Sequence, residues 1–222
     1  NEYEVVVIGA GAAGLSAALV LTRARRSVGV VDAGRPRNAP AAHMQGFLSR
    51  DGMPPADLLA SGRAEVASYG VELVEDHVLG IEPGFTVRLA GGRAIAARRV
   101  LVATGVGDEL PDVAGVRERW ARDVLHCPYC HGWEVRDQPL GVLGTLPGSV
   151  LHALLVRQWS DDVIFFAHTY DLTATEAAEL EARGVRVVRG EVARLVVEDD
   201  RLAHARIVAA VERVGGDPEA DA

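Results

Sequence analysis

Two cysteines stand three residues apart in a short segment with a histidine at each end, His126-Cys127-Pro-Tyr-Cys130-His131. Two thiols at this spacing can close a small disulfide ring, which exchanges electrons with another thiol or with a flavin. A cysteine attacks only as the thiolate, so flanking imidazoles are useful as bases or, when protonated, as counter-charges. We therefore expect thiol/disulfide redox chemistry, with Cys127, Cys130, His126 and His131 as its catalytic residues.

Other interpretations of the cysteine segment remain open. The thiols can be inert core residues or half of a zinc site, but four ligands this close together wrap a tetrahedral ion poorly, and no second Cys-x-x-Cys pair occurs. A total of 2 cysteines is too few for a disulfide scaffold. A thioredoxin-like fold also uses such a pair, but within a single βαβ domain, whereas here it follows a complete nucleotide-binding unit. Redox work is favoured, and we expect no metal.

A glycine-rich turn near the amino terminus predicts a cradle for a dinucleotide. Gly9 permits a tight turn, Gly11 lets backbone amides approach a pyrophosphate, and Gly14 lets a helix pack closely on a strand. Ala12 and Ala13 belong to the same turn, where the helix amino terminus faces the anion.

Two further segments extend this cradle. Asp32 ends the second expected strand, 18 residues after Gly14, where a carboxylate accepts hydrogen bonds from an adenosine ribose and repels a 2′-phosphate. The strand end Ala103-Thr104-Gly105 offers a second close approach of the backbone, although an ordinary strand-ending turn explains it equally well. Spacing alone does not choose between FAD and NAD.

The pattern of apolar runs and turns predicts an α/β fold with two Rossmann-like nucleotide-binding units. We expect an FAD-binding domain over residues 1–109, a second nucleotide-fold domain carrying the cysteines over 110–203, and a tail of unclear role over 204–222. Residues 33–55 form a long, Pro- and Gly-rich loop. The expected strands cover 3–8, 27–31, 71–75, 85–89, 99–103, 140–144, 163–167 and 185–188, and the expected helices cover 15–25, 55–69, 149–159 and 173–183.

Charge and hydropathy exclude two classes of partner. The net charge is −8, and the basic residues are scattered without a run that could track phosphates, so nucleic acid is not an expected partner. Charged residues interrupt every apolar stretch before it reaches the roughly 18 to 20 residues of a membrane span. The amino terminus shows no export signal, and we expect a cytoplasmic protein.

Four motifs in order resemble the low-molecular-weight thioredoxin reductase family: Gly9-Ala-Gly-Ala-Ala-Gly14, Ala103-Thr-Gly105, Leu110-Pro-Asp-Val-Ala-Gly115 and Cys127-Pro-Tyr-Cys-His-Gly-Trp-Glu134. The last is similar to the branch of small-molecule dithiol oxidases that close the disulfides of holomycin and gliotoxin. The resemblance implies FAD on the first unit, Cys130 nearer the flavin, Cys127 exchanging with substrate, and a homodimer. It also implies that a small-molecule dithiol reduces the disulfide and that the electrons pass through the flavin to oxygen.

Three departures from the family pattern are visible. His131 stands where the reductases carry Asp, so His126 and His131 compete as the base. Leu146 replaces the middle glycine of the second unit, and Ala167-His-Thr169 supplies no Arg cluster for a 2′-phosphate, which favours a vestigial site over NADPH binding. After Leu202 we find no return of the chain to the flavin unit, so we expect either a fragment of a longer protein or an incomplete flavin site. We expect a short helix over 205–214.

Three functional hypotheses follow. The first is a flavin-dependent oxidase of a small-molecule dithiol with oxygen as acceptor. The second is an NAD(P)H-dependent reductase of thioredoxin or a similar disulfide. The third is a truncated or degenerate homologue that binds a nucleotide without turnover.

Overall fold

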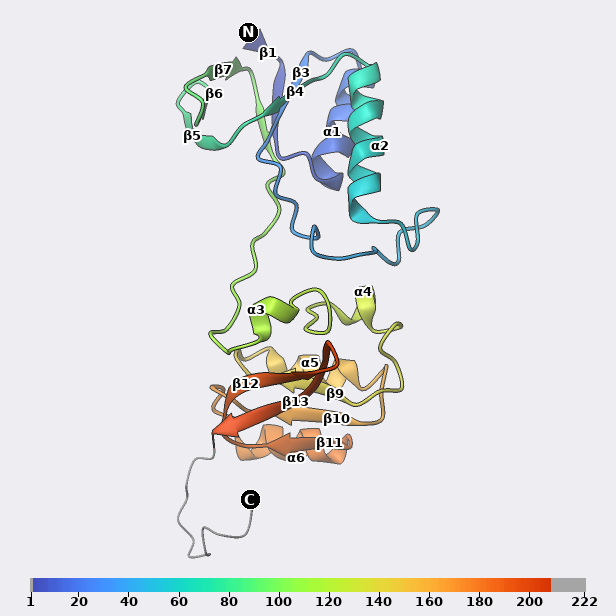
Figure 1. The fold of residues 1–222 in the computed structure, drawn as a ribbon. Coiled ribbons are helices and arrows are strands. Elements are labelled where there is room, and N and C mark those ends of the chain that lie inside the picture. Colours follow the sequence, from blue (N-terminus) through green and yellow to red (C-terminus); the bar gives the residue numbers. More distant parts are fainter. Residues whose placement is uncertain (1, 209–222) are drawn as a thin grey trace, which may run out of the picture. The chain divides into compact units, whose positions relative to one another are not determined.

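The computed structural model describes residues 2–208 of the chain, which separates into two compact units, Asn1–Glu109 and Leu110–Ala222. Each unit contains a stretch in which strands and helices alternate, over residues 5–75 and 140–188 (Figure 1). The parallel sheets confirm the predicted α/β class. Within the described residues, no helix is both long enough and apolar enough to cross a membrane.

The first unit is built on a four-stranded parallel sheet in the order β4-β3-β2-β8. Its central strand, β2, is buried along its whole length because both faces of the sheet are covered. The strands and helices of this layer are β2 (Val5–Ile8), α1 (Ala12–Arg23), β3 (Val28–Asp32), α2 (Pro55–Ser68), β4 (Glu72–Glu75) and β8 (Val100–Val102).

Alternate residues of β2 face different layers, as the period of a strand requires. Val5 and Val7 pack with Leu15 of α1 and Val66 of α2, which lie side by side in Figure 1. Val6 and Ile8 pack instead against a second sheet with the strand order β1-β7-β6-β5. That sheet consists of β1 (Glu2–Tyr3), β5 (Val78–Glu82), β6 (Thr86–Leu89) and β7 (Ala94–Ala97).

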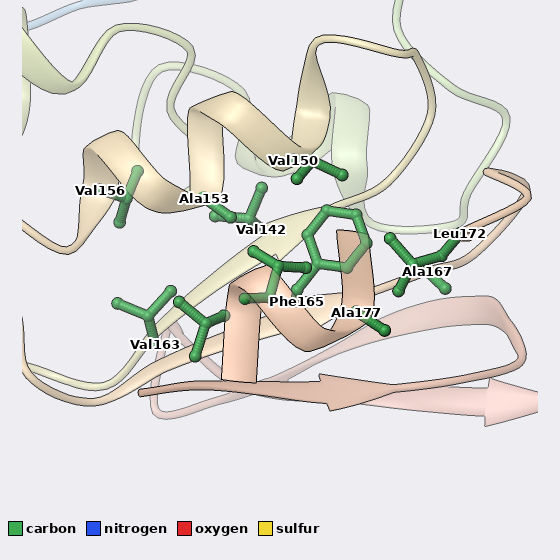
Figure 2. Packing of buried hydrophobic residues seen from close by; sticks show 11 residues of the cluster. Val142, Val150, Ala153, Val156, Val163, Phe165, Ala167, Leu172 and Ala177 are labelled. Atoms are coloured by element: carbon green, nitrogen blue, oxygen red, sulfur yellow. The ribbon is translucent and has the colours of Figure 1, made fainter. Parts of the chain in front are cut away.

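The second unit has a three-stranded parallel sheet in the order β11-β10-β9. Its central strand, β10, alternates in the same way: Val163 and Phe165 are fully buried and pack toward α5 and α6, as Figure 2 shows for Val150 and Ala153 of α5. The elements of this layer are β9 (Leu140–Leu143), α5 (Ser149–Val156), β10 (Val163–Phe166), α6 (Ala174–Ala182) and β11 (Val185–Val188).

A hairpin and short helices complete the second unit. Strands β12 (Glu191–Glu198) and β13 (Arg201–Val208) pair antiparallel, and Val192 of β12 shares a small core with Val116 of α3 (Val116–Arg119). One further helical turn, α4 (Pro128–His131), carries the second cysteine.

Two expectations about secondary structure were wrong. The described part of the expected helix over 205–214 belongs to β13, because its residues pair with β12, and the remainder lies outside the described residues. The segment around Gly91-Gly92 turns a hairpin between β6 and β7, so the strand after that turn is β7 rather than β8. The pattern also missed β5, whose half-exposed residues lack a continuous apolar run.

Candidate functional site

The glycine turn of the first unit is built so tightly that two of its positions exclude a side chain. Gly9 has φ +102°, and a Cβ there would overlap the carbonyl of Ala103. At Gly14 a Cβ would overlap the carbonyl of Gly9. The predicted turn residues and the strand end Ala103–Gly105 are therefore brought together, with Thr104 and Gly105 exposed beside them.

Gly11 is the contrasting position, because a Cβ built on it would meet nothing within 4 Å. It is the N-cap of α1, and no side chain accepts hydrogen bonds from the amides of the first turn. The first amides of any α-helix have no acceptor within the helix, and they lie at the positive end of its dipole. Ala12 and Ala13 are exposed there. The turn thus offers open space and free donors where a pyrophosphate would bind.

Asp32 is held in place by two neighbours. Its Oδ1 accepts a hydrogen bond of 2.9 Å from the backbone amide of Ala10, and its Oδ2 pairs with Arg63 of α2. An ionised carboxylate has about four acceptor sites, so capacity for a ribose remains. Sequence spacing gave no signal for Arg63, because its contact depends on how α2 packs beside α1.

A cleft of about 390 Å³ opens from Asp32 across the carboxyl ends of β3 and β4. Ligands of open α/β sheets bind outside the carboxyl ends of the strands, so the cleft suits the adenosine end of a dinucleotide. The sequence analysis missed most of its lining, although the ends of two adjacent parallel strands would have pointed to it. The cleft is lined by Asp32, Ala33, Gly34, Arg35, Glu75, Asp76 and His77.

In the second unit, Cys127 and Cys130 form a disulfide with their Cα atoms 5.3 Å apart. Cys127 is the N-cap of α4, and Pro128 at the first helical position favours the turn. The amides of Cys130 and His131 donate to the carbonyl of Cys127 at 3.1 and 3.2 Å. The proline and the helical turn thus hold the two sulfurs at bonding distance.

The surroundings of the disulfide leave it accessible. Both cysteines and His131 are half-buried and His126 is exposed. Because the sulfurs bond each other, neither is a free thiolate for zinc, and residues 2–208 contain no cluster of three His, Cys, Asp or Glu that could hold a metal. The pair is thus present as the disulfide with which the redox interpretation begins.

A further histidine, His152 of α5, was missed by the sequence analysis. Burial lowers its pKa, and the positive charge of His126 lowers it further. His152 therefore lies near enough to the cysteine segment to be influenced by the charge on its first histidine. No spacing rule connects the two positions, because their proximity depends on the fold.

In the second unit, the side chain of Ser149 closes part of the glycine turn. The Ser149 hydroxyl accepts hydrogen bonds of 3.2 Å from the amides of both Thr145 and Leu146. Leu146, which is exposed, stands at the position where the spacing of the first unit has Gly11, whereas Gly148 at the N-cap of α5 is open. Further along the same edge, His168 Nδ1 accepts from the amide of Val192 at 3.0 Å. Two amides of the turn are thus already paired with a side chain.

The sequence matches the family model "Pyridine nucleotide-disulphide oxidoreductase" over residues 3–218. The chain belongs to this family. Its thioredoxin reductase-like members bind FAD, so the predicted cofactor class and the predicted resemblance are both confirmed.

Three related proteins show how similar this chain is to known proteins in sequence and structure. The thioredoxin reductase sirT of Leptosphaeria maculans is 36% identical over 159 residues, which are 67% of this chain and 48% of that protein. Among solved structures, HlmI is 63% identical with a TM-score of 0.90, covering 93% of this chain and 67% of that one. A thioredoxin reductase from Bacillus anthracis is 34% identical with a TM-score of 0.87, covering 92% and 71%. The chain thus spans about half the length of the curated relatives it matches.

Proposed function

We propose that this protein is an FAD-dependent oxidase that converts a small-molecule dithiol into a disulfide, with oxygen as the final electron acceptor. The observation that carries the proposal is the contrast between the two glycine turns. The turn of the first unit has a glycine, Gly11, at its third position, whereas the second has Leu146 there and uses Ser149 to bind two of its amides. Electrons then enter from a dithiol rather than from NADPH.

The residues of the first unit fit FAD. The amides after Gly11 would hold the pyrophosphate, Asp32 the ribose, and the cleft beyond Asp32 the rest of the adenosine. Gly9 and Ala103–Gly105 would allow the backbone to approach the cofactor closely. When bound, FAD would accept two electrons from the reduced cysteine pair and release them to oxygen.

The cysteine pair performs the exchange with substrate. A substrate thiolate attacks Sγ of Cys127, the Cys127–Cys130 bond breaks, and Cys130 leaves as a thiolate. The second substrate thiol attacks the mixed disulfide, releasing Cys127 and the oxidised product. Two electrons reach the cysteines, and the two substrate protons pass to nearby bases, for which His126 and His131 are the proposed acceptors.

The alternative is an NAD(P)H-dependent disulfide reductase, which is favoured by the intact βαβαβ arrangement of the second unit. Fold alone does not supply a binding site, however. A nucleotide would have to displace Ser149 from two amides and move the side chain of Leu146.

Oxygen consumption distinguishes these functions. The purified chain, incubated with FAD, is mixed with dithiothreitol in air, and a parallel sample receives NADPH with a chromogenic disulfide. We expect the first sample to consume oxygen and the second to leave NADPH unoxidised. Rapid NADPH oxidation would favour the reductase, and a colourless protein inactive in both assays would favour a homologue without turnover. Gel filtration of the same sample tests the proposed homodimer.

A further inference from the structure

One charged side chain lies on the packed face of α2. Arg63 is half-buried, whereas the other charged residues of this helix, Asp57 and Glu65, are exposed. It stands four residues after Leu59 and three before Val66, and both of these pack in the core shared with α1. A charged group at such a position is costly unless it is paired. The position of Arg63 therefore requires a specific partner.

That partner is Asp32, at the end of β3. Oδ2 of Asp32 pairs with Arg63, while Oδ1 accepts a hydrogen bond of 2.9 Å from the amide of Ala10 in the glycine turn. The pairing depends on close packing of α2 on α1, because a Cβ at Gly62 would lie 3.0 Å from the side chain of Leu15. Arg63 and the glycine turn thus hold the two oxygens of one carboxylate.

The cleft that opens from Asp32 brings further negative charge. Glu75 and Asp76 line it, together with the exposed guanidinium of Arg35. Within residues 2–208, Arg63 is the cation that forms an ion pair with Asp32. Without Arg63, the carboxylate of Asp32 would stand uncompensated beside the turn that is proposed to bind a dianionic pyrophosphate, and like charges repel.

We propose that Arg63 is a positioning residue for the cofactor, which fixes the carboxylate of Asp32 for the adenosine ribose and offsets its charge beside the pyrophosphate. A carboxylate held at both oxygens is already ordered, so less conformational freedom is lost when the ribose binds. Its offset charge no longer opposes the attraction between the amides at the start of α1 and the anion. This role rests on the FAD site of the proposed function, and Arg63 acts there through Asp32.

Equilibrium dialysis of the 222-residue chain against FAD tests this role without turnover. We expect Arg63→Met to raise the dissociation constant for FAD about tenfold, the scale of one hydrogen bond to a charged group. Arg63→Lys keeps the charge and should restore most of the affinity. Arg26→Met removes an exposed arginine that pairs with Glu4 in the same unit, and this control should bind FAD normally. Equal affinity of the wild type and Arg63→Met, or a wild-type chain that binds no FAD, would overturn the proposal.

A double-mutant cycle with Asp32→Asn separates positioning from other roles of Arg63. If Arg63 acts through the carboxylate, Arg63→Met should weaken FAD binding little further once Asp32→Asn is present. An equal further loss in that background would mean that Arg63 contacts the cofactor itself or only stabilises the packing of α2, and would overturn the proposal. These affinities need neither dithiol nor oxygen. A chain that keeps the predicted affinities but consumes no oxygen would therefore refute the proposed function alone.

Discussion

The two glycine turns of this chain begin alike and end differently. Counted from the strand-ending glycine, Gly9 or Gly144, the third position is Gly11 in one unit and Leu146 in the other, and the sixth is Gly14 or Ser149. At the sixth position the first unit has no room for a side chain, whereas the second uses one to bind two amides. Two positions therefore distinguish a turn with no side-chain cap from one in which a side chain binds two amides.

In both units, side chains bind backbone groups that a ligand or solvent would otherwise satisfy. In the first unit, Asp32 accepts from the amide of Ala10 and Asp76 from that of Gly91. In the second, Ser149 and His168 accept from backbone amides, and Arg119 donates to the carbonyl of Asp200. Unpaired backbone groups are costly when buried, so this pattern stabilises both units through their own side chains. The same fold can thus carry a cofactor in one copy and present a disulfide in the other.

The largest effect should come from filling the open turn. Gly11→Val places a branched side chain where the pyrophosphate meets α1, and we expect FAD affinity to fall by about a hundredfold or more, roughly 3 kcal/mol. The matched variant Gly148→Val fills an equally open position at the N-cap of α5 and should keep normal flavin content. Visible absorbance of the purified, folded proteins measures both. Equal flavin loss in the two variants would show that the turns do not differ in function.

A smaller effect is expected from Arg119, which is buried and ties α3 to the hairpin. Its guanidinium binds both carboxylate oxygens of Asp123 at 2.6 and 2.7 Å and the side chain and carbonyl of Asp200 at 2.8 and 2.7 Å. We expect Arg119→Leu to lower the melting temperature of the second unit by roughly 5–10 °C. The three tryptophans lie in that unit, so their fluorescence reports on it. An unchanged melting temperature would show that these contacts of Arg119 do not stabilise the second unit.

The pairing of Arg119 with Asp123 also predicts a pH dependence of stability. Arg119 is the main cause that holds the pKa of Asp123 below its ordinary value, and the amide of Leu202 adds to it. A carboxylate with a lowered folded pKa contributes stability above its unfolded pKa of about 4 and loses it as the pH falls through the folded value. The free energy of unfolding should therefore fall below about pH 4, and it should fall less steeply in Arg119→Leu. A parallel acid dependence in both proteins would argue against the assignment.

The smallest effect concerns the closed turn. Ser149→Ala removes the acceptor for the amides of Thr145 and Leu146, and we expect a loss of about 1 kcal/mol in the stability of the second unit. Urea unfolding followed by tryptophan fluorescence measures it, and flavin content should stay unchanged. An unchanged free energy of unfolding in Ser149→Ala would mean that solvent satisfies these amides equally well.

Local sequence patterns predicted most of the fold and the central parts of both candidate sites. Buried runs such as Val5–Ile8 and turn glycines such as Gly9 carry their geometry in their own chemistry, and the Cys-Pro-Tyr-Cys segment forms its disulfide within one helical turn. What could not be predicted depends on packing between distant segments. Arg63 of α2 pairs with Asp32 at the end of β3, and the effect of His126 on the pKa of His152 depends on how distant segments pack. Strand β12 lacks a continuous apolar run, because its residues are mostly exposed.

The most direct test of the account is anaerobic reduction of the FAD-loaded chain, followed by its visible absorbance. One sample is mixed with dithiothreitol and another with NADPH, and Cys127→Ser is treated in the same way. We predict that the dithiol bleaches the flavin only when both cysteines are present and that NADPH leaves it oxidised. Rapid bleaching by NADPH, or full bleaching of Cys127→Ser by the dithiol, would contradict the account.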